Sequence, residues 1–362
     1  MNKKILLFVG AYTRPAPHLK SSNAKGIRSY ELDLKTGIIK FLHEMQGVES
    51  PSYIAIDHTN NYLYAISEVF EWQEGLIRAY SIDRATGKLT FINKQATGGS
   101  ICAHLSVDST NRFVLVANYG DGKGVVMFPI RADGGVEPIC SSFEHGGAGP
   151  NIERQERSHV HCILPDPNNQ FVFAADLGID KLVSYFLDLK NGQLIAEPAK
   201  DIALVSGSGP RHFLFHPNGK FVFVIHELDS TICAFSYKEG KLRTLQSIST
   251  LPKDFAGISH CSSIQIAPNG KFLYCANRGH DSLAIYAVNQ STGLLTLIGH
   301  QSTNGETPRD FGIDPTGTFL LVANQDSDTI VTFRIEPATG CLIDLGVVAN
   351  VPTPVCLKMF SV

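Results

Sequence analysis

A block of about fifty residues recurs along almost the whole chain, and it constrains the fold more than any other feature. One turn position marks its register in six copies: Asp57, Asp108, Asp166, His216, Ala267 and Asp314. An aromatic residue opens an apolar run five residues after each of them: Tyr62, Phe113, Phe171, Phe221, Phe272 and Phe319. The gaps between successive turn positions are 51, 58, 50, 51 and 47 residues. A period of this length, built from short β-type segments, is typical of the blades of a β-propeller.

The copy between Gly209 and Ser249 shows what one unit contains. Turn signals at Pro217–Lys220 and Glu239-Gly240 separate segments of alternating apolar residues, as strands joined by tight turns would require. The predicted strands are Arg211–His216, Phe221–His226, Thr231–Tyr237 and Leu242–Ser249. Each copy is therefore predicted to be one blade of four antiparallel strands.

The two ends of the chain share one further blade. Complete copies begin near Pro51, Cys102, Val160, Pro210, Cys261 and Pro308. The N-terminal region holds a copy that lacks its first strand, made of Ile5–Tyr12, Ile27–Leu34 and Ile38–Met45. The C-terminal segment Thr353–Phe360 matches Thr307–Asp314 in register and supplies the missing strand. We predict an all-β fold, a single domain over residues 1–362, in which seven blades form a ring that the C-terminal strand closes on the N-terminal blade.

Composition excludes several classes of function. The formal net charge is −3 and no block of Lys or Arg occurs, so binding to nucleic acid or to an anionic membrane has no electrostatic support. No stretch is long and apolar enough to span a membrane, and the short apolar run Ile5–Val9 is interpreted as a strand. The eight Cys occur singly, which indicates reduced thiols in a cytoplasmic protein, and no spacing typical of a metal or cofactor site is present. We expect a monomer or weak oligomer without metal or cofactor.

The propeller topology places certain positions together at one mouth of the channel. The first strand of each blade lines the channel and the second runs antiparallel to it, so the start of the first and the end of the second share a face. Five residues before the turn stand Ser52, Ala103, His161, Arg211, Ser262, Arg309 and Val355. Ten and eleven residues after it stand Ser67-Glu68, Asn118-Tyr119, Asp176-Leu177, His226-Glu227, Asn277-Arg278 and Asn324-Gln325. Charge concentrated in such a funnel requires pairing by water or a ligand, so this mouth is the predicted binding site.

The candidate catalytic residues are His161, Arg211, Glu227 and Arg278. The candidate substrate-binding residues are His159, Arg154, His212, Asn277 and Arg309. A structural role is the alternative for several of them: Glu227 would neutralise Arg211 or Arg278, and His161 would be a hydrogen-bonded histidine at a strand end. Arg309, one blade further round, and Asn277 could likewise serve the fold alone.

An insertion over residues 141–158 accounts for the longest gap between copies. Its Gly-rich part, residues 144–151, precedes Arg154 and Arg157. By the same topology it lies on the face that carries the convergent charges. It would either cover the mouth in part, with an arginine pointing inward, or remain a solvated loop.

Several stretches of the sequence resemble the lactonase family of seven-bladed propellers, which includes bacterial 6-phosphogluconolactonases and is related to the fungal 3-carboxy-cis,cis-muconate lactonizing enzyme. The matching stretches are Gly10-Ala11-Tyr12-Thr13, Gly149-Pro150-Asn151, Arg154-Gln155, His159-Val160-His161, Gly209-Pro210-Arg211-His212, Glu227, Ala276-Asn277-Arg278-Gly279 and Pro308-Arg309. The resemblance covers essentially the full length. The His, Arg, Glu and Arg proposed for the fungal enzyme's active site correspond to His161, Arg211, Glu227 and Arg278.

The resemblance implies hydrolysis of a sugar δ-lactone, with 6-phosphogluconolactone as the expected substrate and a small phosphorylated or carboxylated lactone as the ligand class. Glu227 or His161 would activate water as a general base, and the other would help to protonate the leaving alkoxide. Arg211 and Arg278 would stabilise the oxyanion or bind an anionic group of the substrate. The alternatives are a carboxymuconate-type lactonizing cycloisomerase and a propeller that only binds partners. The scaffold type with a Trp-Asp in each blade is excluded because the chain has one Trp, Trp72.

Overall fold

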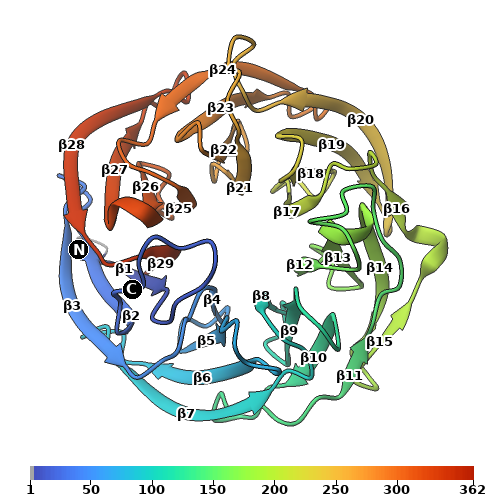
Figure 1. Ribbon diagram of the computed structural model, residues 1–362. Helices are drawn as coiled ribbons and strands as arrows, with labels where there is room; N and C mark the ends of the chain where they lie inside the picture. Colours follow the sequence, from blue (N-terminus) through green and yellow to red (C-terminus); the bar gives the residue numbers. More distant parts are fainter. Residues whose placement is uncertain (1–3) are drawn as a thin grey trace.

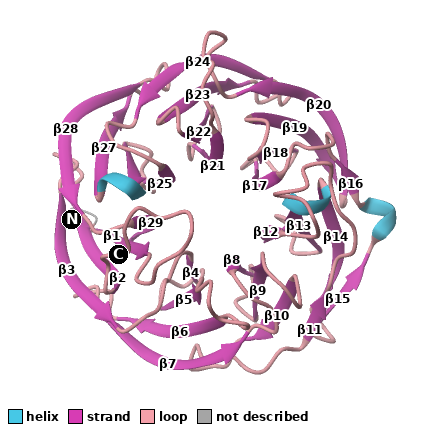
Figure 2. Cartoon of the chain, in the orientation of Figure 1, coloured by secondary structure: helices cyan, strands magenta, loops and turns pink. Residues whose placement is uncertain are grey.

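The computed structural model describes residues 4–362, which form a ring of β-sheets around a central axis (Figure 1). Within those residues the strands make seven antiparallel sheets of four strands, one of which carries a short fifth strand. The remainder is almost entirely loop, apart from 3-10 turns at Leu177–Ile179 (η1), Pro198–Lys200 (η2) and Gln325–Ser327 (η3) (Figure 2). The predicted all-β, seven-bladed propeller of four-stranded blades is confirmed.

The strands of each blade follow one another from the channel outward (Figure 1). The second blade consists of β4 Ile54–Ile56, β5 Tyr62–Ser67, β6 Leu76–Ile82 and β7 Leu89–Ala96. The third blade consists of β8 Cys102–Val107, β9 Phe113–Asn118, β10 Val125–Pro129 and β11 Ser141–Phe143. The fourth blade consists of β12 Val160–Pro165, β13 Phe171–Asp176, β14 Lys181–Asp188 and β15 Gln193–Ala196, with the short β16 Ile202–Ala203 beside β14. The fifth blade consists of β17 Pro210–Phe215, β18 Phe221–His226, β19 Thr231–Lys238 and β20 Lys241–Ser249. The sixth blade consists of β21 His260–Ile266, β22 Phe272–Arg278, β23 Ser282–Val288 and β24 Leu295–Ser302. The seventh consists of β25 Pro308–Ile313, β26 Phe319–Asn324, β27 Thr329–Ile335 and β28 Leu342–Asn350.

The N-terminal blade is completed by the other end of the chain. Its order is β29 Pro354–Ser361, β1 Ile5–Ala11, β2 Gly26–Leu32 and β3 Ile39–Gln46. β29 pairs antiparallel with β1, from Ile5 opposite Ser361 to Gly10 opposite Cys356. The two termini therefore lie side by side (Figure 1). The predicted closure of the ring by the C-terminal strand is confirmed.

The repeated turn residue caps the loop between the first two strands of a blade. One carboxylate oxygen of Asp57 accepts hydrogen bonds from the backbone N–H groups of Asn61 and Tyr62, both at 2.8 Å. Asp108, Asp166 and Asp314 accept the same type of bond. These acceptors satisfy backbone donors that the tight turn leaves without partners, which explains why the position recurs.

The aromatic residue after the turn packs against the neighbouring blade. The hairpin glycine of the next blade, such as Gly293 or Gly340, lies over the ring of Phe221 or Phe272 with φ of +75° and +73°. A Cβ on Gly340 would come within 2.3 Å of the Phe272 ring, so both the space and the backbone angle require glycine there. Each apolar cluster is accordingly shared by two adjacent blades, and the core follows the ring instead of filling its centre.

The strands that line the channel carry a β-bulge at a common place. In β8, β12, β17 and β25 the register shifts across one residue, which has no partner on the second strand. A bulge bends the strand and redirects the side chain of the extra residue. The residues at these bulges are Ala103, His161, Arg211 and Arg309.

Candidate active site

A cavity of about 660 Å³ opens at the end of the channel where the inner strands begin. Every blade contributes to its wall, and so does the loop after β1, through Pro17 and His18. This is the face on which the sequence predicted convergence. Of the nine predicted site residues, eight line the cavity: His161, Arg211, Glu227, Arg278, His159, Arg154, His212 and Arg309.

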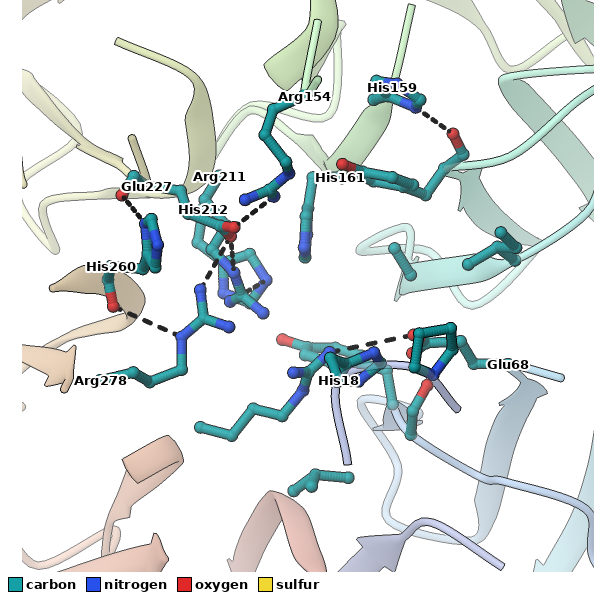
Figure 3. Close-up of a pocket in the computed structure, with 18 of the residues that line it drawn as sticks. His18, Glu68, Arg154, His159, His161, Arg211, His212, Glu227, His260 and Arg278 are labelled. Carbon is teal, nitrogen blue, oxygen red and sulfur yellow. Dashed lines mark hydrogen bonds and ion pairs between the residues drawn. The ribbon is translucent and has the colours of Figure 1, made fainter. Parts of the chain in front are cut away.

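The Glu227 carboxylate is the centre of an ion-pair network on one wall (Figure 3). Arg154 Nη2 lies 2.5 Å from Oε1, while Arg211 Nε and Arg278 Nη2 each lie 2.9 Å from Oε2. Burial alone would raise the pKa of Glu227, but the guanidiniums of Arg278, Arg211 and Arg154 hold it well below its ordinary value. Glu227 is therefore a fixed carboxylate, which is poor as either a proton donor or a proton acceptor at neutral pH.

The arginines around Glu227 differ in how much of the guanidinium faces the cavity. Arg211 is deeply buried and also donates to the Ser262 carbonyl, and burial followed by the nearby Arg278 lowers its pKa to about 10. Arg278 donates to the Cys261 carbonyl at 3.0 Å. The side chains of Arg278 and Arg154 remain 17% and 34% exposed, against 4% for Arg211. Arg278 and Arg154 thus present N–H groups to a ligand, whereas Arg211 supports Glu227 from beneath.

The His161 imidazole lies beside this network (Figure 3). Its Nδ1 has no hydrogen-bond partner among the residues that the structure describes. Burial lowers the pKa of His161 well below its ordinary value, and the charge of Arg211 lowers it further. The ring is therefore neutral at physiological pH. Because Nδ1 is itself buried, Nε2 is the ring nitrogen left to interact with a ligand in the cavity. The alternative of a hydrogen-bonded strand-end histidine does not fit the unpartnered Nδ1.

Two further predicted histidines pack around His161. The His212 ring centroid is 5.3 Å from that of His161, and its Nε2 lies 3.3 Å from Arg211 Nη1. His159 stacks on Tyr119 with centroids 4.3 Å apart, and its Nδ1 bonds the Tyr119 carbonyl at 2.8 Å. These contacts fix the position of the aromatic side chains on this side of the cavity.

The inserted segment covers part of the mouth. Its first three residues are not loop, as the sequence had suggested, but form β11, because they pair with β10 and complete that blade. The loop beyond is anchored by His145, whose Nδ1 lies 2.7 Å from Asp176 Oδ2, and by the buried side chain of Gln155. This anchoring directs Arg154 into the cavity, while Arg157 pairs with Asp121 at the rim.

Asn277 is the predicted site residue that the structure does not bring to the cavity. Its side chain is fully buried within the blade, with Nδ2 donating to the Thr250 carbonyl at 2.9 Å and Oδ1 accepting from the Thr250 hydroxyl at 2.7 Å. Because its amide is engaged in holding the strand ends together, we withdraw the expected contact with substrate.

The opposite wall is built around Arg309. Its Nη2 donates to the Tyr12 hydroxyl at 2.8 Å, and the nearest Glu68 oxygen lies 3.9 Å away. His18 Nε2 lies 3.3 Å from the same hydroxyl. Burial lowers the pKa of His18 to about 2, with Arg309 next in importance, so this imidazole is neutral. Figure 3 shows His18 and Glu68 across the cavity from Glu227 and Arg278.

Several wall residues were absent from the predicted site. Glu68 and Tyr119 occupy the register of Glu227 and Arg278, eleven residues after the turn, and His260 matches His159, seven residues before it. The repeat therefore contained a signal for these three. His18 lies in a loop outside the repeat, and no periodic signal marks it.

Other kinds of site have little structural support in the described part of the chain. Residues 4–362 contain no group of three or more His, Cys, Asp or Glu side chains placed to hold a metal ion. No helix in that range is long and apolar enough to cross a bilayer. All eight Cys are unpaired, and six of them are buried.

Comparison with known proteins agrees with the seven-bladed fold. Residues 6–359 match the family described as "Lactonase, 7-bladed beta-propeller". The chain belongs to this family. The family is the one that the sequence motifs resembled, and the match covers the whole ring.

Individual relatives are similar over most of their length. The chain is 39% identical to the 6-phosphogluconolactonase of Bacillus subtilis over 357 residues, which cover 98% of each chain. It is 36% identical to the 6-phosphogluconolactonase of Formosa agariphila over 311 residues, or 85% of this chain and 86% of that one. Among solved structures, the periplasmic gluconolactonase of Pseudomonas aeruginosa superimposes with a TM-score of 0.91 at 30% identity, covering 98% of this chain and 99% of that one.

Proposed function

We propose that the protein hydrolyses 6-phosphoglucono-δ-lactone to 6-phosphogluconate, a step of the pentose phosphate pathway. Membership of the lactonase family and the names of the relatives at 36–39% identity support this reaction. The observation that carries it is the neutral imidazole of His161 beside arginines fixed by Glu227, all facing one cavity. Such a site can activate water and stabilise an oxyanion at the same place.

His161 is the proposed general base. A water oxygen bonds to the lactone carbonyl carbon and passes one proton to Nε2 of the neutral His161 ring, which gives a tetrahedral oxyanion and an imidazolium. The bond between that carbon and the ring oxygen then breaks, and the imidazolium returns the proton to the departing alkoxide. The histidine ends neutral, and the product acid loses its proton to solvent. A weak base suffices because sugar δ-lactones also open slowly in water alone.

Arg278 and Arg154 are the proposed stabilisers of the oxyanion. Both keep part of the guanidinium exposed to the cavity while an ion pair to Glu227 fixes their position. Donors that are fixed before the reaction need little rearrangement when charge develops, which makes them effective. Glu227 and Arg211 then act as positioning residues.

The cellular setting is part of the proposal. Unpaired and mostly buried cysteines support a reducing cytoplasm, although the Pseudomonas relative is named as periplasmic. We further propose that the ring is one folding domain and that it works as a monomer or weak oligomer on a small lactone.

The test is a lactone-disappearance assay at constant pH, with the spontaneous opening rate subtracted. Purified protein should accelerate opening of 6-phosphoglucono-δ-lactone, and a His161→Gln variant should lose most of that acceleration. No acceleration by the wild-type protein would refute the proposal. Turnover of a carboxymuconolactone instead would favour the cycloisomerase reaction.

A further inference from the structure

We propose that Arg309, held by Tyr12 and flanked by His18, forms the subsite that binds the phosphate of the substrate and so sets the preference for phosphorylated over unphosphorylated lactones. This inference rests on the proposed lactonase function and adds which wall of the cavity recognises the second charged group. The wall around Arg309 would thus bind the phosphate, whereas the wall around Glu227 would hold the groups that act on the lactone carbonyl.

The hydrogen-bonding capacity of Arg309 is the first argument. A guanidinium has five N–H donors. The described residues accept one hydrogen bond from Arg309, at the Tyr12 hydroxyl, and the Glu68 carboxylate at 3.9 Å is beyond hydrogen-bond range. The side chain is only 13% exposed and lines the cavity. A charged group this buried with unused donors is suited to an anion, because such donors otherwise lose the hydrogen bonds that water would give them.

The balance of charge around the cavity is the second argument. The buried and half-buried part of the wall carries the guanidiniums of Arg154, Arg211, Arg278 and Arg309, against the carboxylates of Glu68 and Glu227, an excess of two positive charges. The exposed rim adds Glu153, Glu156 and Arg157, whose charges water screens. Asp310, also on the wall, accepts hydrogen bonds from Ser263 and the backbone of Leu357, and the Lys358 ammonium offsets its charge. A phosphate monoester carries close to two negative charges at neutral pH and would complete this balance.

The position of Arg309 is the third argument. The lactone carbonyl must lie against His161 and Arg278, and the 6-phosphate stands at the other end of the sugar. Figure 3 places His18 and Glu68, the neighbours of Arg309, across the cavity from Arg278 and Glu227. One substrate can therefore span both walls. Because His18 is neutral, the Tyr12 hydroxyl can donate to its Nε2 while accepting from Arg309, which fixes both side chains.

The test compares kcat/KM for 6-phosphoglucono-δ-lactone and glucono-δ-lactone in the wild-type protein and in Arg309→Met. We expect the ratio between the two lactones to fall by about 10- to 100-fold, the range for loss of a charged hydrogen-bonding group. Arg309→Lys should restore part of the ratio because it keeps the charge without the fork geometry. Tyr12→Phe should lower the ratio less, since it removes only the group that orients Arg309.

The matched control is Arg334→Met. Arg334 also lies over an aromatic ring, that of Phe319, but it donates to the Lys35 carbonyl and is not part of the cavity wall. The ratio should not change in this variant. An unchanged ratio in Arg309→Met would overturn the inference, and so would an equal fall for both lactones, which would indicate a role in folding or in the chemical step.

A binding measurement separates the subsite from the proposed reaction. By titration calorimetry the wild-type protein should bind 6-phosphogluconate at least tenfold more tightly than gluconate, and Arg309→Met should lose that preference. This binding preference would support the subsite even in a protein that hydrolysed neither lactone. A failure to hydrolyse either lactone would refute the proposed reaction and leave the subsite standing. Equal affinity of the wild-type protein for the two acids would overturn the subsite.

Discussion

The two walls of the cavity use buried arginine in different ways. On the Glu227 wall, Arg154, Arg211 and Arg278 bond both oxygens of a single carboxylate, and backbone carbonyls take further N–H groups. On the opposite wall, Arg309 bonds a neutral phenol and stands 3.9 Å from the nearest carboxylate oxygen. Ion pairs to one carboxylate hold the arginines of the first wall in a fixed geometry, whereas Arg309 has no close counter-ion and leaves its charge to be balanced by a ligand. The comparison suggests that chemistry and recognition are assigned to different walls.

Removal of a carboxylate charge should reduce stability and activity far more on the Glu227 wall than on the Arg309 wall, and this is the largest effect that we expect. Glu227→Gln leaves buried guanidiniums without their counter-ion, so we expect the free energy of unfolding to fall by about 3–5 kcal/mol and turnover to be nearly lost. Glu68→Gln, on the other wall, should cost about 1 kcal/mol, because Glu68 makes no close ion pair. Urea denaturation and the lactone assay measure both. Similar losses in the two variants would remove the distinction between the walls.

Substitution of the proposed base should affect activity without affecting the fold. In His161→Gln we expect kcat to fall by about 10² to 10⁴, the usual contribution of a general base. The Nδ1 of His161 has no partner among the described residues, so the urea midpoint should change little. His159→Gln is the control on the same strand end, and its kcat should fall much less. A His161 variant with kcat within tenfold of wild type would exclude this residue as the base.

Removal of a proposed oxyanion donor should have a smaller effect. Arg278→Met should lower kcat by about a hundredfold, roughly 3 kcal/mol of transition-state stabilisation. Unlike Arg309→Met, it should lower the rates of phosphorylated and unphosphorylated lactones by a similar factor. Steady-state kinetics with both lactones distinguishes these patterns. Selective loss of the phosphorylated lactone would reverse the assignment of the two walls.

The pH dependence should be the smallest effect. Because burial, followed by the charge of Arg211, lowers the pKa of His161, the neutral form that acts as base persists as the pH falls. Lowering the pH from about 8 to about 6 should therefore change kcat less than twofold, whereas a histidine with the ordinary pKa of about 6.5 would retain roughly a quarter of its neutral form. Initial rates at saturating lactone, corrected for spontaneous opening at each pH, provide the measurement. A loss of rate centred near pH 6.5 would contradict a neutral His161.

The repeat was enough to predict the fold. The turn position recurs because its side chain caps the turn of its own blade. The aromatic residue and the hairpin glycine recur because adjacent blades contact each other through them, so the structural reason and the sequence signal coincide. The exact extent of the insertion was harder to predict. Ser141–Phe143 has no strong strand pattern and becomes a strand because β10 is available for pairing.

The site was predictable where it follows the repeat. Successive residues of a strand point to opposite sides. The side chains ten and eleven residues after the turn, at the end of the second strand, therefore point in different directions. Four of the six residues eleven after the turn, Glu68, Tyr119, Glu227 and Arg278, face the cavity. Asn277, ten after its turn, points into the blade, which explains why its predicted contact with substrate was wrong. His18 could not be predicted, because a loop outside the periodic pattern brings it to the cavity.

Closure of the ring by β29 has a consequence during protein synthesis. Until β29 emerges from the ribosome, β1 is paired with β2 on one edge only, although its seven residues are all buried in the finished ring. The cavity wall is also incomplete, since β29 contributes Val355 to it. Exposed apolar edges of this kind promote pairing between chains. Nascent chains should therefore be inactive and prone to aggregate, and they should depend on chaperones until β29 has emerged.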